Sequence, residues 1–394
     1  GYVLLKYDGQ GKFQWLEYGE NGNIQELDWT SAGLVCAMVF EGTVVVDGSS
    51  FSSTASTQSP AQDIMIAVID GNGQLISSEQ IRGNGNVDAR ALVCNDTMCI
   101  LQGKFDNALS IDGMDYYTSG TSIYRAYQYA FRIQQFQYKW TNVSAEPFSK
   151  LMDGLHMGAD GRFYSKAIYE DVFEMQGFST QSEGDRDILV LWQDLDSGNI
   201  IEGRSFGSLN SDEIFNVSEN LGRVVISGAS NSNQIQFDGV TIDNQNQIRI
   251  PYIVVLDTTF KGQCALNVSD DIDGQVFQSR IVGDTLYSLL SVSSSTHVGD
   301  TSLSAFGVFD LALVKMILPC NRLMGASEIV NVKTEQSLSI YPNPFSTQTQ
   351  LNYHTLHGTR PVLQLTDMLG RTVQKVQLPA NEGTYSLDAS TLGA

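Results

Sequence analysis

Few residues of this chain have the types and spacing that catalysis or metal binding needs. There are four histidines in 394 residues. The chain has no His-x-x-x-His, Cys-x-x-Cys or Gly-x-Ser-x-Gly motif, so no sequence motif indicates a zinc site, a redox site or a serine-hydrolase site. His156 lies between Gly154 and Gly158, and we interpret it as a loop histidine rather than a base. The sequence therefore predicts no metal site, no cofactor and no identifiable catalytic residue.

Carboxylates are the one abundant reactive group, and they leave two alternatives open. The Asp-Gly turns at Asp8 and Asp70 resemble calcium loops but lack the bidentate Glu of an EF-hand, and they suit hairpin turns better. Asp270, Asp271 and Asp273 are the best candidates for calcium ligands. Paired carboxylates for glycoside hydrolysis also stay open, although the sequence singles out no pair.

The charge of the chain restricts its partners. The formal net charge is −21, from 44 acidic and 23 basic residues, and the excess lies before residue 329. A surface this acidic repels phosphate backbones, so we expect no nucleic acid or anionic lipid as a partner. No apolar run approaches the roughly 18 residues of a transmembrane helix. The chain opens directly into a strand-like segment, and we expect a signal peptide to have been removed or left out.

A repeat of strand-like segments organises the N-terminal region. Apolar strands end at matching positions at intervals of 61 to 63 residues; these positions are Asp8, Asp70, Ile133, Asp194 and Asp257. A sixth copy begins at Asp310. A second register, with intervals of 60 to 65 residues, runs through glycines: Gly48, Gly113, Gly177, Gly239 and Gly299. Two agreeing registers indicate a true structural repeat.

Each repeat contains two hairpins and no amphipathic helix, as in 64–113. There, 64–69 and 75–81 form the first hairpin, 90–94 and 99–102 the second, and 108–111 an outer strand. About four short strands per unit are typical of a β-propeller blade. We therefore predict an all-β fold in which residues 1–325 form a β-propeller. Six blades are favoured and seven are an alternative, with the ring closed by strands from just before Gly1.

Aromatic and cysteine residues fit this interpretation. Trp15 and Trp140 occupy equivalent positions in their units, so we expect them to pack between blades. Most tyrosines between Tyr116 and Tyr129 are predicted to lie in the core; the alternative is that they form exposed rings that stack on sugars. Cys94 and Cys99 flank a four-residue turn and are predicted to form a disulfide, as befits an oxidising compartment. Cys264 and Cys320 form a second candidate pair, and Cys36 is predicted to be a single buried thiol.

Three motifs mark the end of the chain: Tyr341-Pro342-Asn343-Pro344-Phe345, a turn with Asp367, Gly370 and Arg371, and a late strand with Gly383 and Tyr385. The paired prolines begin a domain, and the alternating runs around the turn predict a small antiparallel β-sandwich. Together the motifs resemble the type A C-terminal sorting domain of type IX secretion cargo in Bacteroidota. The resemblance covers residues 337–394 and implies that the residues of these three motifs form the sorting signal. We expect residues 326–336 to be a linker. The family has one more strand and a basic terminus, so we expect the domain to be incomplete at its end.

The resemblance implies a secretion route for the protein and proteins of the secretion machinery as its partners. The protein would pass the periplasm and the outer membrane and be secreted or held at the cell surface. Its partners would be an outer-membrane shuttle barrel and the translocon. Three triplets also resemble the O-glycosylation acceptor of Bacteroidota, with Thr97, Thr258 and Thr285 as the acceptors.

For the propeller the sequence favours binding over catalysis. We expect a binding or adhesion module for a glycan or another surface ligand, of use in gliding motility, and no enzymatic activity. The alternative is a carbohydrate-active enzyme with carboxylates at the central mouth of the ring. A convergence of three or four acids with an aromatic residue at that mouth would favour the enzyme.

Overall fold

The computed structural model describes residues 1–53, 61–119, 124–145, 152–158, 161–244, 249–268, 275–282, 285–292, 295–298, 301–304, 310–317, 337–341, 348–354, 362–366, 372–378 and 382–388. They belong to two compact units, Gly1–Leu323 and Met324–Ala394. The predicted linker, 326–336, lies outside the described residues.

The N-terminal unit is built from antiparallel sheets whose main strands follow one another in chain order. It opens with the hairpin of β1 (Tyr2–Tyr7) and β2 (Phe13–Gly19). The next two sheets contain β3 (Gly22–Thr30), β4 (Gly33–Phe40), β7 (Asp63–Ile69) and β8 (Leu75–Gly83), then β9 (Val87–Cys94), β10 (Met98–Asp106), β13 (Tyr124–Arg132) and β14 (Gln137–Val143).

Two further complete sheets and a shorter one follow. They contain β15 (Met152–Met157), β16 (Arg162–Tyr169), β19 (Asp187–Asp194) and β20 (Ile200–Phe206), then β21 (Asp212–Asn220), β22 (Arg223–Ser230), β25 (Ile250–Asp257) and β26 (Gly262–Asn267), and last β27 (Gln275–Val282), β28 (Thr285–Val292) and β31 (Asp310–Ile317). One short 3-10 helix, η1 (Gln134–Phe136), joins β13 to β14.

In each of the five sheets that follow β1-β2, a small hairpin is inserted between the second and third strands. These hairpins are β5 (Thr43–Val46) with β6 (Ser49–Ser52), β11 (Ala108–Ile111) with β12 (Met114–Tyr117), β17 (Val172–Met175) with β18 (Phe178–Gln181), β23 (Gln234–Phe237) with β24 (Val240–Asp243), and β29 (Ser295–Val298) with β30 (Thr301–Ser304). Asp47 and Gly48 have φ of 44° and 73°, and Asp112 and Gly113 have 49° and 75°. Such two-residue turns need positive φ, which explains the glycine register of the sequence.

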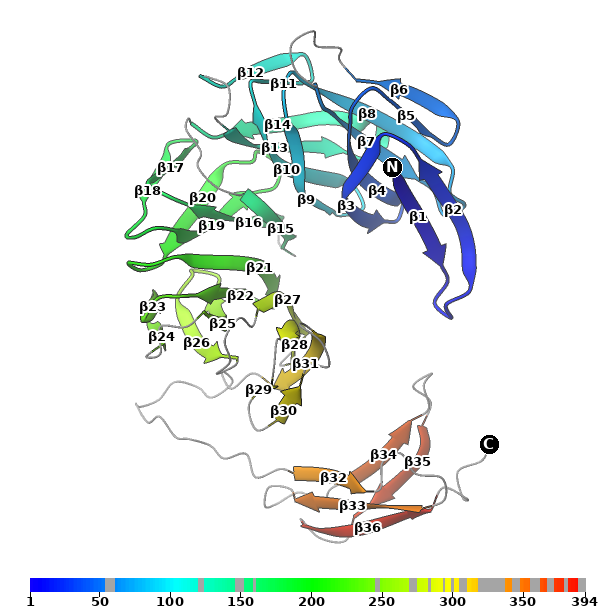
Figure 1. The fold of residues 1–394 in the computed structure, drawn as a ribbon, viewed down its shortest axis with the longest axis vertical. Helices are drawn as coiled ribbons and strands as arrows, with labels where there is room; N and C mark the ends of the chain where they lie inside the picture. Colours follow the sequence, from blue (N-terminus) through cyan, green and yellow to red (C-terminus); the bar gives the residue numbers. More distant parts are fainter. Residues whose placement is uncertain are drawn as a thin grey trace. The chain divides into compact units, whose positions relative to one another are not determined.

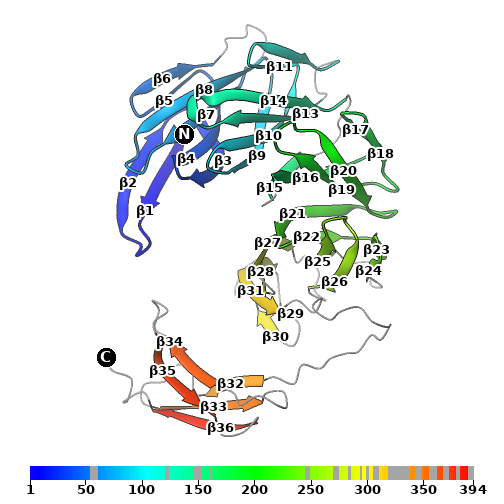
Figure 2. The same cartoon turned by 180° about the vertical axis from the view of Figure 1, so that it is seen from behind.

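The sheets stand face to face in an arc with their first strands on the inside (Figure 1). β9, β15, β21 and β27 lie toward the centre, and the inserted hairpins lie toward the outside in both views (Figure 2). This is the all-β, propeller-type arrangement that the repeat predicted. The described strands give the first sheet two strands and the last sheet three, so the count of six blades stays a prediction.

The phase of the predicted repeat was wrong. The hairpins β7-β8 and β9-β10 both form, but they belong to neighbouring sheets, because β4 pairs with β7 across the inserted hairpin. Strand β11, which we placed outside the second hairpin, instead pairs with β8 of the preceding sheet. A period fixes the length of a repeating unit but not where the unit begins, so the sequence could not distinguish the two phases.

Each complete sheet buries both of its faces. All eight residues of β4 and all seven of β7 are buried. One face of this sheet, with Met65 and Ala67, packs on Tyr2 and Leu4 of β1. The opposite face packs on the next sheet, and the same pattern continues along the arc. Burial of each such aliphatic side chain contributes about 1.5–3 kcal/mol, which explains the near-continuous apolar runs of these strands.

The turns after the third strands are closed by aspartate side chains. Oδ1 of Asp70 accepts hydrogen bonds from the backbone N–H of Asn72 (2.7 Å) and Gln74 (2.9 Å). Asp8 and Asp257 make the same pair of bonds in their turns. The N–H of Gln74 and its neighbours lower the pKa of the Asp70 carboxyl. The repeated aspartates are therefore Asx-type turn residues.

Polar side chains and indoles join neighbouring sheets. Gln128 Nε2 donates to Oε1 of Gln102 (2.9 Å) and of Gln193 (3.0 Å), and Gln193 Nε2 donates back to Gln128 Oε1 (2.8 Å). All three side chains are fully buried. As predicted, Trp15 and Trp140 pack between sheets: their Nε1 atoms donate to the backbone oxygens of Gly71 (3.0 Å) and Leu195 (2.9 Å).

The described residues of the C-terminal unit form two small antiparallel sheets. β32 (Ser337–Tyr341), β33 (Gln348–His354) and β36 (Glu382–Asp388) form one, and β34 (Val362–Thr366) and β35 (Thr372–Gln377) form the other. Leu351 and Leu387 are buried in this unit.

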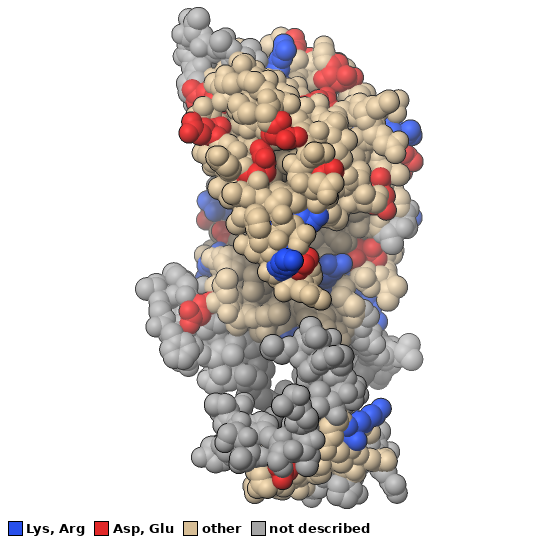
Figure 3. Space-filling view, turned by 90° about the vertical axis from the view of Figure 1, so that its right-hand side faces the viewer, with Lys and Arg blue, Asp and Glu red and all other residues tan. Residues whose placement is uncertain are grey.

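On the face shown in Figure 3, acidic side chains form several small separate groups with basic groups among them. The charge is therefore spread out rather than gathered into one acidic patch on that face. Among the described residues there is no helix with the length and apolar character to span a membrane.

The buried amide cluster gives a first prediction. Replacing Gln128 by Ala leaves Gln102 Oε1 buried without its donor and removes two hydrogen bonds of Gln193, which keeps Ser165 and Gly198 as partners. We therefore expect the free energy of unfolding to fall by about 2–3 kcal/mol. Urea unfolding followed by tryptophan fluorescence measures this change. The exposed Gln10→Ala variant is the control and should stay within about 0.5 kcal/mol of the parent. Equal stability of the two variants would contradict the structural role of the cluster.

Candidate functional site

The inner strands share an irregularity that the sequence did not reveal. In each of β3, β9, β15, β21 and β27 the pairing with the second strand skips one residue, which is a β-bulge. The skipped residues lie 62 to 65 positions apart: Gln25, Arg90, Asp153, Phe215 and Phe277. A bulge bends its strand and redirects side chains, and bulges are common beside functional sites. The bulges therefore mark the inner strands as the candidate site.

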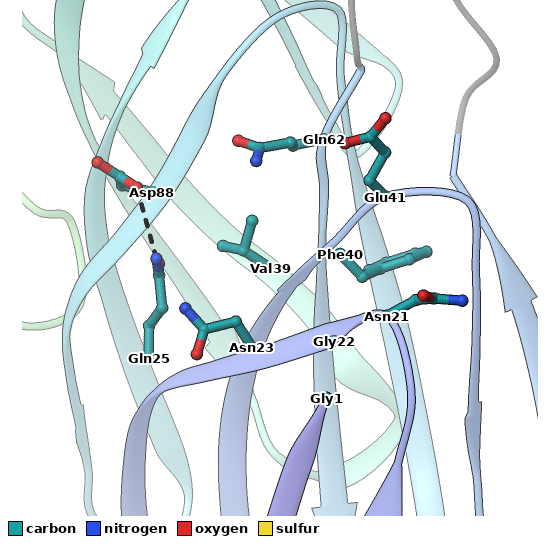
Figure 4. A pocket seen from close by; sticks show the side chains of 10 residues that line it. All are labelled: Gly1, Asn21, Gly22, Asn23, Gln25, Val39, Phe40, Glu41, Gln62 and Asp88. Carbon is teal, nitrogen blue, oxygen red and sulfur yellow. Dashed lines mark hydrogen bonds between the residues drawn. The ribbon is translucent and has the colours of Figure 1, made fainter.

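The residues at the first two bulges, Gln25 and Arg90, both contact the carboxylate of Asp88. Oδ2 of Asp88 lies 2.6 Å from Nη2 of Arg90 and 3.7 Å from Nζ of Lys104. Gln25 Oε1 accepts the N–H of Ala89 (2.6 Å), and its Nε2 donates to Asp88 Oδ1 (3.4 Å). Figure 4 shows Gln25 reaching across to Asp88 beside a cavity of about 280 Å³. The bulges at Gln25 and Arg90 thus join β3 to β9 through polar contacts.

The third bulge holds a buried ion pair. Nζ of Lys166 lies 2.5 Å from Oδ1 of Asp153 and donates to the backbone oxygen of Ile214 (3.2 Å). The Lys166 side chain is only 3% exposed. An ammonium group this buried needs a carboxylate partner, and β21 of the next sheet supplies a further acceptor. The ion pair therefore fixes Asp153 at the inner side of β15.

Glu26, beside the first bulge, has the most unusual environment of these carboxylates. Burial raises its pKa to about 7; Arg90 and Lys166 act against this shift, and Asp153 adds to it. A carboxyl with such a pKa exchanges its proton near neutral pH, as a general acid or base must. Glu26, Arg90, Asp153 and Lys166 form what we call the inner charged cluster. It comes from three different sheets.

A larger cavity, of about 570 Å³, lies along the far ends of the inner strands. Polar and aromatic side chains line it, among them Asp28, His156, Asn216, Asn220, Arg280 and Tyr287. His156 lies in strand β15, paired with Tyr164, so the prediction that it lies in a loop was wrong. Its Nε2 lies 3.0 Å from the backbone oxygen of Glu219. Burial lowers the pKa of His156, so the ring is neutral at pH 7. We call this cavity the inner groove. It offers hydrogen-bond donors and acceptors and a tyrosine ring.

The predicted sorting residues are spread over the C-terminal unit. Tyr341 ends β32, and Gly383 and Tyr385 lie in β36, opposite Tyr353 and Leu351 of β33. The other seven lie outside the described residues: Pro342, Asn343, Pro344, Phe345, Asp367, Gly370 and Arg371. Their role as the sorting signal stays a prediction at the level of single residues.

The predicted glycosylation sites are not brought together. Thr97 is exposed in the turn between β9 and β10, where its Oγ1 donates to Asn95 Oδ1 (2.9 Å). Thr258 is half-buried after β25, and Thr285 begins β28. None shares a site with another, and all three stay predictions.

The cysteines form the arrangement that the turn geometry requires. Cys94 and Cys99 face each other across β9 and β10, with Cα atoms 4.1 Å apart, and form a disulfide. Cys36 is a buried thiol. Cys264 is disulfide-bonded, whereas Cys320 lies outside the described residues.

The calcium candidates Asp270, Asp271 and Asp273 also lie outside the described residues. Within the described part of the chain no group of three or more His, Cys, Asp or Glu side chains could hold a metal ion. Of the tyrosines between Tyr116 and Tyr129, Tyr127 and Tyr129 are fully buried and Tyr116 packs partly buried against the core, whereas Tyr124 is half-buried and Tyr117 is 61% exposed.

Sequence reasoning missed the inner charged cluster and the inner groove. The positions of the bulges repeat with the period of the strands, but the residues at them do not, so no motif was visible. Only the paired strands show which residue is skipped.

The chain resembles known proteins in two different ways. Residues 339–394 match the family model "Secretion system C-terminal sorting domain". No curated protein matches the chain. An uncomplexed acylaminoacyl peptidase of Pyrococcus horikoshii shares 12% identity at a TM-score of 0.35, covering 87% of this chain and 59% of that chain. The orthorhombic crystal form of the same peptidase shares 10% sequence identity at a TM-score of 0.32, covering 84% of this chain and 58% of that chain. This chain therefore spans less than two thirds of those proteins.

These structures correct one expectation. We expected the propeller to have no enzymatic activity, but the solved structures that it resembles are those of an enzyme, so that expectation is contradicted and withdrawn. Similarity at these TM-scores does not carry peptidase activity over to this chain.

The family match decides the route of the protein. It covers the three motifs that the sequence showed at its end, from the strand before the paired prolines to the late Gly-x-Tyr strand. A sorting domain of this kind directs export to the cell surface or into the medium. Residues 339–394 thus match a secretion system C-terminal sorting domain, and this match supports export of the chain through the type IX secretion system.

Proposed function

We propose that the exported protein is a surface binding module whose propeller binds a glycan in the inner groove. The observation that carries this proposal is the groove itself, about 570 Å³ lined by residues of β3, β15, β21, β27, β28 and β31. Ligand pockets commonly have volumes of 300–1,000 Å³ and a few convergent polar groups. Adhesion at the cell surface follows from such binding.

The chemistry of the groove suits a polyhydroxylated ligand. Asn216, Asn220 and Gln278 carry amides, which both donate and accept hydrogen bonds, as sugar hydroxyls do. Tyr287 offers an aromatic face for the apolar side of a sugar ring. His156 is neutral at pH 7 and adds no charge. These groups supply polar recognition together with a stacking surface.

The groove predicts the effect of one substitution. Replacing Tyr287 by Ala removes the stacking surface, and we expect affinity for the best ligand on a printed oligosaccharide array to fall at least tenfold. Tyr117→Ala is the matched control, because Tyr117 is exposed on β12 away from both cavities. Unchanged binding by the Tyr287 variant, or no binding of the parent protein to any oligosaccharide, would contradict a glycan site in the groove.

A second function is favoured by the inner charged cluster. Glu26 and Asp153 are carboxylates in opposite environments: burial raises the pKa of Glu26 to about 7, whereas Asp153 is paired with Lys166. Glycoside hydrolases use two carboxyl groups whose environments push their pKa values apart. One is protonated and acts as the acid, and the other is ionised. In this alternative Glu26 would donate the proton to the leaving oxygen and Asp153, held by Lys166, would be the second carboxylate.

The environment of Glu26 also predicts a pH dependence of stability. Its pKa is about 7 in the folded state against 4.5 ordinarily, so its contribution to stability is full below about pH 4.5 and is lost as the pH rises through 7. We expect the difference in melting temperature between the parent and Glu26→Gln to change across this window. Glu174→Gln, at an exposed position of β17, should follow the parent.

The same variants test the enzymatic alternative. Aryl glycosides of several sugars are the substrates, and Glu26→Gln should abolish any hydrolysis that Glu174→Gln retains. A pH-independent melting difference would contradict the assigned environment of Glu26. Hydrolysis that survives in Glu26→Gln would exclude Glu26 as the acid.

For the sorting domain we propose the outer-membrane shuttle barrel and the translocon as partners. The family match supports this assignment. Deletion of residues 337–394 should leave the protein in the periplasm of its host, because the machinery would lack its recognition element. Cell fractionation measures this distribution, and circular dichroism of the purified truncated chain controls for folding. A folded truncated protein at normal levels outside the cell would overturn the assignment.

A further inference from the structure

A separate cavity of about 470 Å³ lies beside the turns that follow β9, β13 and β19. Met98 and Leu195 in its wall are buried, and together with Trp140 they belong to one apolar cluster that joins the sheets of β13 and β19. None of its lining residues lines the inner groove. We call this cavity the junction pocket. It lies at an internal junction of the arc, and both of the sheets that form it have four strands.

The turn after β13 differs from its equivalents in other sheets. The position after the third strand holds Asp70 and Asp257 in two other sheets, where their side chains close the turn. Here it holds Ile133, which is 3% exposed and cannot accept those N–H groups, and the chain forms η1 instead. Gln135 and Phe136 have φ of 65° and 47°, which residues other than glycine rarely adopt. Strained backbone of this kind is common at ligand sites.

The residue before Ile133 departs from the repeat as well. Arg132 is exposed at the end of β13, whereas the residues that pair equivalently in the other sheets are at most 1% exposed; these are Ile69, Gln193 and Leu256. Arg132 lines the junction pocket, and among the described residues no carboxylate forms an ion pair with it. Its guanidinium group is therefore available to an anion in the pocket.

A β-bulge brings a second cation to the pocket. In β14 the pairing with β13 skips Lys139, so the strand presents an extra side chain there. The corresponding bulges of β8 and β20 hold Ile76 and Ile201, so the cation is particular to this junction. Nζ of Lys139 lies 3.6 Å from Oδ1 of Asp196, whose side chain is 87% exposed. Two basic groups and one acidic group leave the pocket with one positive charge, in a chain of net charge −21.

We propose that the junction pocket binds a hexuronate, a sugar residue that carries one carboxylate. The fork of N–H donors on Arg132 matches a carboxylate in geometry, and Lys139 adds a second positive charge. The hydroxyl of Thr97 and the amide of Gln134 suit sugar hydroxyls, and the apolar wall suits the C–H groups of the ring. A single carboxylate balances the charge of the pocket, whereas a polyanion would be repelled by the acidic chain. The proposal does not depend on the inner groove.

Isothermal titration calorimetry with the full chain tests this site. The probes are two oligosaccharides that each carry one terminal hexuronate, glucuronate in one and galacturonate in the other, and the methyl ester of each is the neutral control. We expect at least one acid to bind, its ester to bind at least tenfold more weakly, and sodium chloride to weaken binding of the acid. Thr97 is a predicted glycosylation acceptor, so the protein is made in an expression host without that glycosylation.

Three substitutions of exposed side chains distinguish binding from a structural role. Arg132→Gln should lower the affinity for the acid at least tenfold. Asp196→Asn should raise it about two- to fivefold, because it releases Lys139 from an exposed ion pair. Arg82→Gln removes the same charge from an exposed position of β8 that does not line the pocket, and it should bind as the parent does. The melting temperatures of all three variants should match that of the parent.

The Tyr287→Ala variant of the inner groove should bind the acid as the parent does. Loss of binding in that variant would place the acid in the inner groove and overturn the proposal. No binding of either acid, equal binding of acid and ester, or full binding by Arg132→Gln would overturn it as well. Equal affinity for a tripeptide with a free C-terminal carboxylate would contradict recognition of a sugar.

Discussion

The packing of each sheet on both of its neighbours is the constraint on which the rest of the N-terminal unit depends. Because both faces of a sheet such as β4-β7 are buried, polar side chains have few places left: the turns, the inserted hairpins and the inner strands. Where a polar group does lie between sheets, as Gln128 does, its hydrogen bonds are satisfied by its neighbours. The inner strands are the positions where charge can gather without disturbing the core.

The β-bulges give this constraint a functional consequence. A regular strand would alternate its side chains between two buried faces, whereas a bulged strand presents an extra residue. At Arg90 and Asp153 that residue is charged and paired, with Asp88 and Lys166 respectively. The two proposed functions, binding in the inner groove and proton transfer at Glu26, both rest on this one repeated deformation.

The sequence allowed the fold to be predicted where local chemistry decides it. The turn aspartates, the glycines of the inserted hairpins and the Cys94–Cys99 pair each depend on neighbours a few residues away, and the structure contains all of them. The phase of the repeat and the bulges depend on which distant strands pair, such as β4 with β7. The site was missed for the same reason, since Glu26 and Asp153 lie on different sheets and share no motif. The sorting domain was recognisable because its motifs are local.

We propose that the C-terminal domain delivers to the cell surface a propeller whose inner strands bind a ligand. Delivery is tested by a pull-down with the full chain from detergent-solubilised outer membranes of its own host. We expect recovery of a shuttle barrel and translocon, and their loss when residues 337–394 are deleted. Recovery of a different surface complex, unaffected by that deletion, would contradict it.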